Sequence, residues 1–224
     1  MKLLKEYGLT EKQISSFAKY RDLLLEWNQK FNLTAITDLD EIEEKHFIDS
    51  LFLDKFVDLD NKTLLDVGSG AGFPGIPLAI VHSSLKVTLL ESNGKKVSFL
   101  KVAKKELGLE NVEIIQVRSE EFNKRESFDI VTARAVKELN ILLEITFHLV
   151  KVGGVFVAYK SSNIDEEIKH ASKAFKTLEI SDFCKHEYKL PKSQDNRVLL
   201  VISKQKSTKK KYPRQYSEIV KAPL

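Results

Sequence analysis

A glycine-rich segment in the first half of the chain has the composition of a ligand-binding turn. The residues DVGSGAGFPG at 66–75 follow a short apolar stretch that predicts a strand over 63–68. Glycines at the carboxyl end of a first parallel strand let the backbone approach a ligand closely and turn sharply into a helix. Glu91 falls at the end of the next predicted strand, where a carboxylate can accept both hydroxyls of a ribose. Together these features predict a site for a ligand that contains adenosine.

The same turn favours S-adenosylmethionine over a nicotinamide dinucleotide. GAGFPG at 70–75 matches the G-x-G-x-x-G dinucleotide pattern, but the predicted strand already ends at Gly68, so the matching glycines lie late in the turn. Pro74 and Pro77 also remove N–H donors from the start of the helix, where a pyrophosphate would be held. S-adenosylmethionine carries no phosphate, and the acidic Asp66 suits its cationic sulfonium. A nucleotide-dependent oxidoreductase is the alternative.

Polar residues also follow the third and fourth predicted strands. Ser119 and Glu120 come after the strand over 112–117, at the position where doubly wound folds bind adenine. A helix N-cap with an acidic first turn is their structural alternative. Arg134 follows the strand over 128–132 and borders the same crevice, where it can orient the cofactor, stack on a base or contact phosphate. A surface ion pair is its alternative role.

Two missing motifs limit which atom could accept a methyl group from such a cofactor. Exocyclic amines usually require an Asp/Asn-Pro-Pro-aromatic turn after the fourth strand, where this chain has TARA at 132–135. Pyrimidine C5 requires a cysteine nucleophile, but the single cysteine, Cys184, lies in a late strand candidate and is most simply a small apolar filler. A ring nitrogen such as guanine N7 is already nucleophilic at neutral pH and needs alignment rather than a general base. We therefore assign no catalytic acid or base.

His46, Asp49 and Ser50 are spaced i, i+3 and i+4, which places them on one face of a predicted helix. They can close over the methyl donor or guide RNA, and a polar surface cluster is the alternative. The five histidines show no metal-ligand spacing, so we expect no metal.

Basic residues are the candidates for contact with RNA. The segment KQKSTKKKYPR at 204–214 contains six Lys or Arg and no acidic residue. Such a stretch can bind phosphates by releasing counterions, and a solvated, mobile tail is the alternative. Lys160, at the end of the fifth predicted strand, and Arg197 are further candidates. Together with His46 and Arg134, these two residues are predicted to lie next to the substrate.

The elements that position these residues alternate between strands and helices. Strands are predicted over 63–68, 86–91, 112–117, 128–132 and 154–160, with helices near 75–82, 95–107 and 138–150 between them. Two further strands, over 176–190 and 196–204, can finish the sheet as an antiparallel pair. The alternation predicts an α/β fold with a doubly wound, mostly parallel seven-stranded sheet. The order of the motifs along it resembles that of class I, Rossmann-like methyltransferases.

The first sixty residues predict helices instead. Thr10 and Gln13 have capping-box spacing, and a second amphipathic helix is predicted over about 39–56. After the capping box, large apolar side chains recur on one helical face, namely those of Phe17, Tyr20, Leu24, Trp27 and Phe31. We therefore expect an N-terminal helical extension (1–60) packed on the core, a methyltransferase core (61–205) and a basic C-terminal tail (206–224).

The bulk composition sets the cellular context that we expect. The chain has 224 residues, which is long enough for one α/β domain with a modest extension. Its net charge is +4. Neither a membrane-spanning run nor a signal-peptide core is visible, and a single cysteine excludes a disulfide framework. We expect a cytoplasmic monomer that does not act at a membrane.

Motifs spread over nearly the whole chain carry a family resemblance. The most specific is DVGSGAGFPGIPLAI at 66–80. The others are Trp27-Asn28, Asn32-Leu33-Thr34, His46 with Asp49-Ser50, Lys95-Lys96, Phe99-Leu100, Val117-Arg118-Ser119-Glu120, Ala133-Arg134-Ala135, and the closing Tyr212-Pro213-Arg214 with Lys221 and Pro223-Leu224. In these motifs the chain resembles the ribosomal RNA small subunit methyltransferase G family. Thr132 and Ser119 stand at positions where other members can carry different small residues.

The resemblance implies an enzyme that transfers a methyl group from S-adenosyl-L-methionine to guanine N7 in 16S ribosomal RNA, near the decoding site. The substrate would be 16S ribosomal RNA, the 30S subunit or its assembly intermediate. By resemblance the cofactor-site positions are Gly68, Phe73, Ser119, Glu120 and Arg134, to which the turn itself adds Gly70 and Glu91. Two alternatives stay open: a small-molecule methyltransferase, and a non-catalytic RNA-binding factor that retains the cofactor pocket.

Overall fold

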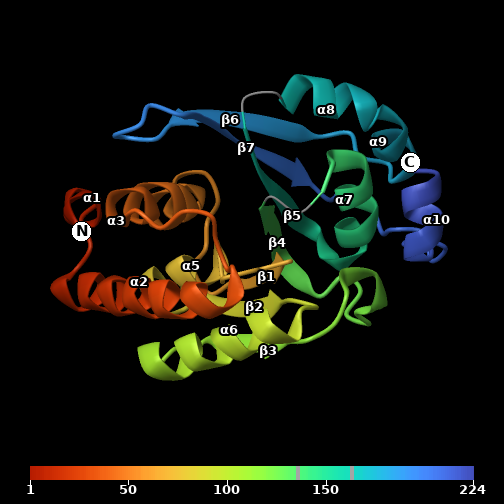
Figure 1. The fold of residues 1–224 in the computed structure, drawn as a ribbon. Helices are drawn as coiled ribbons and strands as arrows, with labels where there is room; N and C mark the ends of the chain where they lie inside the picture. Colours follow the sequence, from red (N-terminus) through yellow and green to blue (C-terminus); the bar gives the residue numbers. More distant parts are fainter. Residues whose placement is uncertain (135–136, 162–163) are drawn as a thin grey trace.

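The protein is built around one seven-stranded sheet (Figure 1), and the computed structural model describes residues 1–134, 137–161 and 164–224. The strand order is β3-β2-β1-β4-β5-β7-β6. Strands β1 to β5 run parallel, and β7 is antiparallel to both β5 and β6. The strands are β1 (Thr63–Val67), β2 (Lys86–Leu90), β3 (Val112–Ile115), β4 (Phe128–Arg134), β5 (Val150–Ser161), β6 (Phe183–Lys189) and β7 (Asn196–Ser203). The predicted doubly wound, mostly parallel sheet and its closing antiparallel pair are confirmed.

The order of the strands reverses between β1 and β4. These strands are neighbours in the sheet, with Val67 opposite Ala133, although β2 and β3 separate them in the sequence. The glycine-rich turn after β1 and Arg134 at the end of β4 therefore leave the sheet at the same edge. Open α/β sheets bind ligands at such a reversal, beyond the carboxyl ends of the strands.

Helices cover both faces of the sheet, and each face has its own hydrophobic core. Successive residues of a strand point to opposite faces, so Leu64 belongs to one core and Leu65 to the other. One face carries α2 (Glu11–Phe31), α5 (Gly75–Val81) and α6 (Gly94–Leu107), and the other carries α7 (Leu139–Thr146), α8 (Ile164–His170), α9 (Ser172–Thr177) and α10 (Tyr216–Lys221). Burial on both faces explains why the parallel strands are almost continuously apolar.

The N-terminal helices begin with α1 (Lys2–Glu6), and α2 follows with the predicted capping box. The Thr10 side chain accepts from the Gln13 N–H, and the Gln13 side chain accepts from the Thr10 N–H. Along α2, Phe17, Tyr20 and Leu24 are fully buried against the core that α5 and α6 share. The predicted apolar face therefore docks the helix on the sheet domain.

The helix predicted over 39–56 forms as a continuous helical stretch over 39–55, but its geometry changes along the stretch, which consists of four short pieces. These are α3 (Leu39–Glu41), a π-helical segment (Ile42–Ile48), α4 (Asp49–Leu51) and a 3₁₀ turn (Phe52–Lys55). The wider π-helical turn changes the angular spacing along this stretch, and such turns are common at functional sites. His46 lies within it.

The strand predicted over 176–190 is wrong in its first half. Residues Ser172–Thr177 form α9, which follows α8, and β6 begins only at Phe183. The buried residues of this region, Ala171, Ala174 and Leu178, are spaced three and four apart, which is the period of a helix that covers the second core. The alanines do not stand out in the sequence as an apolar stripe.

Two smaller boundaries also differ from the prediction. Helix α7 ends at Thr146, followed by a 3₁₀ turn (Phe147–Leu149), and β5 begins at Val150 rather than at residue 154. An irregularity in the pairing of β4 with β5 near Phe128 accommodates the earlier start. None of the helices within the described ranges combines the length and apolar character that a membrane span requires.

Candidate active site at the carboxyl edge of the sheet

The glycine-rich turn leaves β1 in a conformation that glycine adopts most easily. Gly68 and Gly70 have φ values of 66° and 60°, in the left-handed region. The Gly68 N–H donates to the Leu90 carbonyl at 2.8 Å, and the Gly70 N–H donates to the Glu91 carboxylate at 2.9 Å. A Cβ added to Gly70 would meet only the Gly68 carbonyl oxygen, 3.8 Å away. Gly70 therefore borders space that a ligand can enter.

Glu91 holds this turn from the end of β2. Its second carboxylate oxygen accepts the Asn93 N–H at 2.8 Å, and the side chain is buried. Each carboxylate oxygen has two lone pairs, so these bonds leave acceptor capacity for ribose hydroxyls.

Asp66 lies beneath the turn rather than on the surface of the site. Its side chain is fully buried, and one oxygen accepts the Gly75 N–H at 2.9 Å while the other has no hydrogen-bond partner within the described residues. Burial is the main reason that the pKa of Asp66 rises to about 7, and the Gly75 N–H and Arg134 partly oppose it. A Cβ on Gly75 would collide with Leu89 and with this carboxylate. Asp66 thus joins β1 to the start of α5.

A narrow cleft of about 150 Å³ opens beside the turn, and it contains three of the predicted cofactor residues, Gly68, Ser119 and Glu120. Ser119 and Glu120 lie in a 3₁₀ turn after β3, where the Ser119 hydroxyl contacts the Glu120 carboxylate at 3.3 Å. The full lining of this narrow cleft is Val67, Gly68, Leu90, Ser92, Val117, Arg118, Ser119, Glu120, Lys137, Ile145 and Tyr216.

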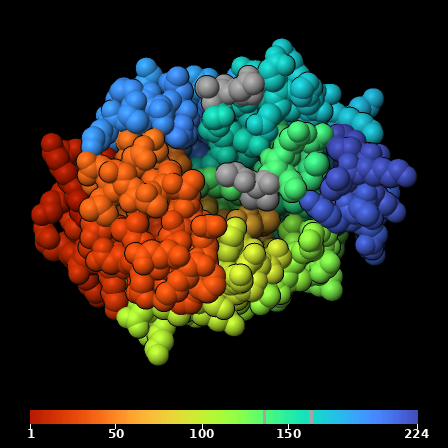
Figure 2. All heavy atoms as spheres, in the orientation of Figure 1, coloured from red at the N-terminus to blue at the C-terminus, as the bar shows by residue number. Residues whose placement is uncertain are grey.

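A wide cleft of about 450 Å³ lies between the N-terminal helices and the ends of β4 and β5. It is lined by Ile36, Lys45, His46, Asp49, Arg134, Tyr159, Lys160, Ser161, Glu167 and Arg197. All four residues that the sequence places next to the substrate are among them. Figure 2 looks onto the face where the N-terminal part, in red and orange, meets the green and blue C-terminal half. The wide cleft therefore joins segments that are far apart in the sequence.

Arg134 is the most connected residue of the wide cleft. Its guanidinium donates to the Asp49 carboxylate at 3.1 Å and to the Lys45 carbonyl at 3.3 Å. The guanidinium carbon also lies 5.0 Å from the centre of the Phe73 ring, within range of a cation–π contact. The side chain is only 15% exposed, so these contacts fix its plane. Ala135, the next residue of the family motif, lies outside the described residues.

His46 connects the π-helical segment to the glycine-rich turn. Its ring stacks on Phe73 with centroids 4.4 Å apart, and its two nitrogens contact the Thr34 hydroxyl at 2.8 Å and Arg134 at 3.2 Å. Burial, together with the positive charge of Arg134, lowers the pKa of His46 from 6.5 to about 3. The imidazole is therefore neutral at physiological pH. Phe73 itself is buried beneath this pair.

Lys160 and Arg197 border the wide cleft from β5 and β7. The Lys160 ammonium is paired with Glu167 at 2.5 Å and donates to the Lys137 carbonyl at 3.1 Å. The Arg197 guanidinium lies 3.8 Å from Asp49 and 3.3 Å from Asp195. Both cations reach the cleft, but both are partly neutralised by carboxylates.

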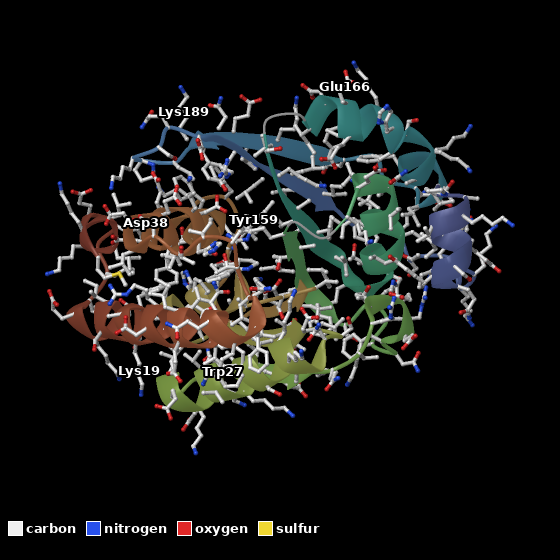
Figure 3. The ribbon with its side chains drawn as sticks, in the orientation of Figure 1. Lys19, Trp27, Asp38, Tyr159, Glu166 and Lys189 are labelled. Atoms are coloured by element: carbon white, nitrogen blue, oxygen red, sulfur yellow. The ribbon has the colours of Figure 1, made fainter. Side chains whose placement is uncertain are left out.

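Tyrosines support the site in a way that the sequence did not indicate. The Tyr188 hydroxyl donates to Asp49 at 2.8 Å, and the Tyr159 hydroxyl donates to the Ser50 carbonyl at 2.8 Å. Tyr159, a residue of β5, lies where the sheet meets the N-terminal helices (Figure 3). Tyr20 of α2 donates to the carbonyl of Ala71 in the glycine-rich turn. Side-chain patterns along single elements carry no signal for such contacts between distant segments.

The basic tail is folded onto the second core rather than extended. Lys204 is fully buried, where its ammonium donates to the Phe147 carbonyl at 3.0 Å and pairs with Glu126 at 3.1 Å. Arg214 pairs with the buried Glu144 at 2.6 Å. The predicted use of the whole basic run for phosphate contact is therefore wrong for Lys204, which cannot reach a ligand. Lys210 and Lys211 are exposed.

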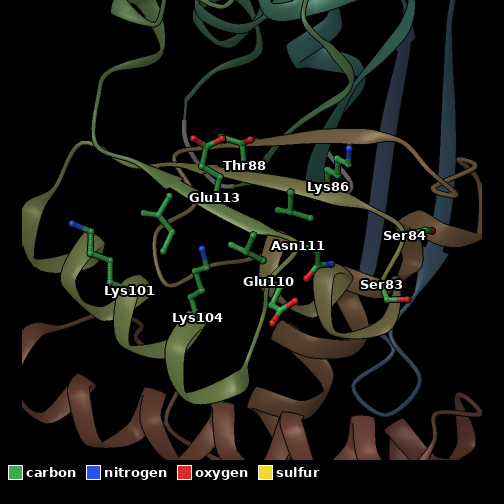
Figure 4. A pocket seen from close by; sticks show the side chains of 12 residues that line it. Ser83, Ser84, Lys86, Thr88, Lys101, Lys104, Glu110, Asn111 and Glu113 are labelled. Carbon is green, nitrogen blue, oxygen red and sulfur yellow. The ribbon is translucent and has the colours of Figure 1, made fainter.

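A larger hollow of about 850 Å³ lies elsewhere, along β3 and α6 at the far edge of the sheet (Figure 4). Lys86, Lys101, Lys104 and Glu113 are among its lining residues, and none of the predicted site residues is. Among the described residues, no group of three or more His, Cys, Asp or Glu side chains is arranged to hold a metal ion.

Comparison with known proteins decides the family. The model of the rRNA small subunit methyltransferase G family matches residues 13–196. A protein named ribosomal RNA small subunit methyltransferase G from Lysinibacillus sphaericus is 45% identical over 99% of this chain and 96% of its own length. Its namesake from Staphylococcus epidermidis is 44% identical over 99% of this chain and 95% of its own. The chain belongs to the rRNA small subunit methyltransferase G family.

Membership of the rRNA small subunit methyltransferase G family agrees with the fold. A solved structure from Methanococcus maripaludis, described as a putative S-adenosyl-L-methionine-dependent methyltransferase, superimposes with a TM-score of 0.59 at 16% identity. The superposition covers 75% of this chain and 91% of the Methanococcus maripaludis chain. At this identity the likeness concerns the fold alone.

Proposed function

We propose that this chain transfers a methyl group from S-adenosyl-L-methionine to N7 of a guanosine in 16S ribosomal RNA. Family membership supports the ribosomal RNA substrate, since the matched relatives carry the name ribosomal RNA small subunit methyltransferase G. The observation that carries the proposal is the pair of clefts at the reversal of strand order, one with three of the predicted cofactor residues and one lined by several cations.

The residues of the narrow cleft and the turn fit the cofactor. Gly70 leaves space beside the backbone, and the Ser69 hydroxyl and one Glu120 oxygen are buried without hydrogen-bond partners within the described residues. Buried polar atoms of this kind are normally satisfied, so a ligand with matching groups accounts for them. When bound, S-adenosyl-L-methionine supplies an electrophilic methyl group. Gly68, Gly70, Phe73, Glu91, Ser119, Glu120 and Arg134 are the proposed residues of its site.

The wide cleft supplies what attack by a ring nitrogen needs. Guanine N7 carries no proton, so the chain has to align the base and exclude water rather than remove a proton. The planar Arg134 guanidinium, held by Asp49, can stack on a base or bind its acceptor atoms. His46 is neutral and adds no positive charge next to Arg134. Lys45, Lys160 and Arg197 at the rim suit the phosphates of RNA.

The decisive experiment is incubation of the protein with labelled S-adenosyl-L-methionine and either naked 16S ribosomal RNA or 30S particles. We expect one labelled guanosine, methylated at N7, near the decoding site. Label at any other atom would contradict the proposal, and cofactor binding without transfer to any ribosomal substrate would favour a non-catalytic factor. Turnover in the absence of RNA would favour a small-molecule methyltransferase.

The cellular form of the enzyme is part of the same proposal. We propose a cytoplasmic monomer divided into a helical extension (1–60), a methyltransferase core (61–205) and a C-terminal segment (206–224). Residues from the extension and the core both line the wide cleft, so we expect neither part to be active alone.

A further inference from the structure

The C-terminal segment reaches the narrow cleft through one aromatic side chain. Tyr216, the first residue of α10, lines the cleft together with Gly68, Ser119 and Glu120. Its half-buried ring lies 5.2 Å from the Arg118 guanidinium carbon and 6.0 Å from the Lys137 ammonium. The last part of the chain thus contributes a wall to a cleft that is otherwise lined by the ends of the strands, the segments that follow them and α7.

The position of Tyr216 is fixed by buried contacts on both sides of it. Two residues before it, Arg214 binds the fully buried Glu144 with two nitrogens, at 2.7 and 2.6 Å. Three residues after it, Ile219 is fully buried in the second core. Upstream, Arg125 donates to the Tyr212 carbonyl at 2.6 Å. A fixed backbone holds the ring at the cleft without further ordering when a ligand binds.

The residues that line the narrow cleft indicate which chemical group can bind there. Val67, Leu90 and Ile145 supply apolar surface, and Tyr216 adds an aromatic ring. One oxygen of the Glu120 carboxylate is buried, lies 3.6 Å from the Arg118 guanidinium and has no hydrogen-bond partner within the described residues. A planar heteroaromatic group with an N–H donor on its edge satisfies both features, because its faces contact apolar and aromatic surface while its edge reaches the carboxylate. Adenine, with its exocyclic amine, is such a group.

We propose that Tyr216 is a binding residue for the adenine end of S-adenosyl-L-methionine, so that the C-terminal segment forms part of the cofactor site. This inference rests on the proposed function, because it assumes that the narrow cleft receives the cofactor. It gives the segment a role in cofactor affinity that is separate from any contact of its exposed lysines with RNA.

The test is calorimetric titration of the full-length chain with S-adenosyl-L-methionine and, separately, with 5′-methylthioadenosine. We expect Tyr216→Ala to weaken the binding of both ligands by about tenfold, which lies within the range of about five- to a hundredfold and more for the loss of one base–aromatic contact. Both ligands contain adenosine, so an equal loss assigns the contact to that end of the cofactor. Tyr216→Phe keeps the ring and should bind within about twofold of the unmodified protein.

Ser217→Ala is the matched control, because Ser217 is the next residue of the same helix and is exposed. Thermal unfolding of each variant checks that the fold is retained, and Tyr216→Leu replaces Tyr216→Ala if the alanine variant unfolds. Unchanged or tighter binding by a folded Tyr216 variant without the ring would overturn the inference alone. Failure of the unmodified protein to bind S-adenosyl-L-methionine would instead overturn the proposed function.

Discussion

Arg134 and Asp49 lie 85 positions apart in the sequence, yet the guanidinium of one donates to the carboxylate of the other at 3.1 Å. The second oxygen of Asp49 accepts the Tyr188 hydroxyl at 2.8 Å. Since Asp49 is buried, neither contact is screened by water to the extent of a surface pair. This one carboxylate joins the N-terminal helices, β4 and β6 at the wall of the wide cleft.

Arg134→Lys should therefore impair methyl transfer although it conserves the charge. Lysine lacks the planar fork that contacts Asp49 and lies over Phe73, so the base would lose its alignment. We expect the rate of methyl incorporation into 16S ribosomal RNA to fall by about a hundredfold, measured with labelled cofactor and 30S particles. Because Arg134 is also a proposed residue of the cofactor site, the affinity for S-adenosyl-L-methionine should fall as well, but only by about fivefold, since lysine keeps the positive charge. A variant with near-normal incorporation would remove Arg134 from the transfer step.

Gly70→Val should abolish cofactor binding. The added side chain would project into the space beside the turn, where only the Gly68 carbonyl lies within 4 Å of a Cβ at this position. Valine at a φ of 60° also strains the backbone, so a control for strain is needed. Gly108→Val provides it, because Gly108 has a φ of 64° and open space around it at the end of α6. Both variants should lose similar stability in denaturant, but only the Gly70 variant should lose binding by calorimetry. Equal affinities in the two variants would contradict the expectation.

The neutral His46 predicts a specific dependence of stability on pH. The pKa of His46 is about 3 in the folded protein, and its ordinary value of 6.5 applies to the unfolded chain. Between these two pH values the unfolded chain therefore binds a proton that the folded chain does not. His46 therefore lowers the free energy of unfolding as the pH falls below its ordinary pKa. Between about pH 7.5 and about pH 5.5, the unmodified protein should lose about 1.4 kcal/mol more than His46→Gln, measured by urea unfolding.

The comparison with His46→Gln isolates this effect from other buried groups. Asp66, whose pKa is raised to about 7, loses its contribution to stability as the pH rises, and it acts in the opposite direction. His148, whose pKa is lowered to about 3 by burial, acts in the same direction as His46. Both groups are present in the two proteins and cancel in the difference. Parallel pH profiles for the two proteins would contradict the expectation, because they would mean that His46 keeps its ordinary pKa in the folded state.

Replacing Lys209, Lys210 and Lys211 by alanine should weaken RNA binding if the C-terminal segment contacts phosphates. The slope of log affinity against log salt should become shallower by about 0.7 for each lost phosphate contact with single-stranded RNA. Lys209 pairs with Glu179 at 2.8 Å, so we expect most of the change in slope to come from the loss of Lys210 and Lys211. Filter binding at several salt concentrations measures the slope.

Alanine at Lys2, Lys5 and Lys12 removes the same charge from the opposite end of the molecule and serves as the control (Figure 1). An identical change in slope for the two triple variants would show a general effect of net charge, and an unchanged slope for Lys209–Lys211 would exclude the segment from RNA contact.

The sequence by itself determined the alternation of strands and helices, the capping box of α2 and the glycine-rich turn after β1. These features depend on interactions between residues close in the chain: the period of apolar side chains, the freedom of glycine at Gly70 and the local bond between Thr10 and Gln13. The family motifs added the proposed cofactor residues that follow β3 and end β4. Where the local signal was weak, as at Ala171 and Ala174, the helix α9 was missed, and the strand predicted over 176–190 began before Phe183, where β6 starts.

Only the tertiary structure decided which of the candidate residues act together. The contacts of Asp49 with Arg134 and Tyr188, the burial of Lys204 and the placement of Tyr216 at the narrow cleft all join segments that are distant in the chain. Such contacts follow from how the sheet is ordered and how the two cores pack, because a side chain's period along its own helix or strand says which face it occupies but not which residue meets it there.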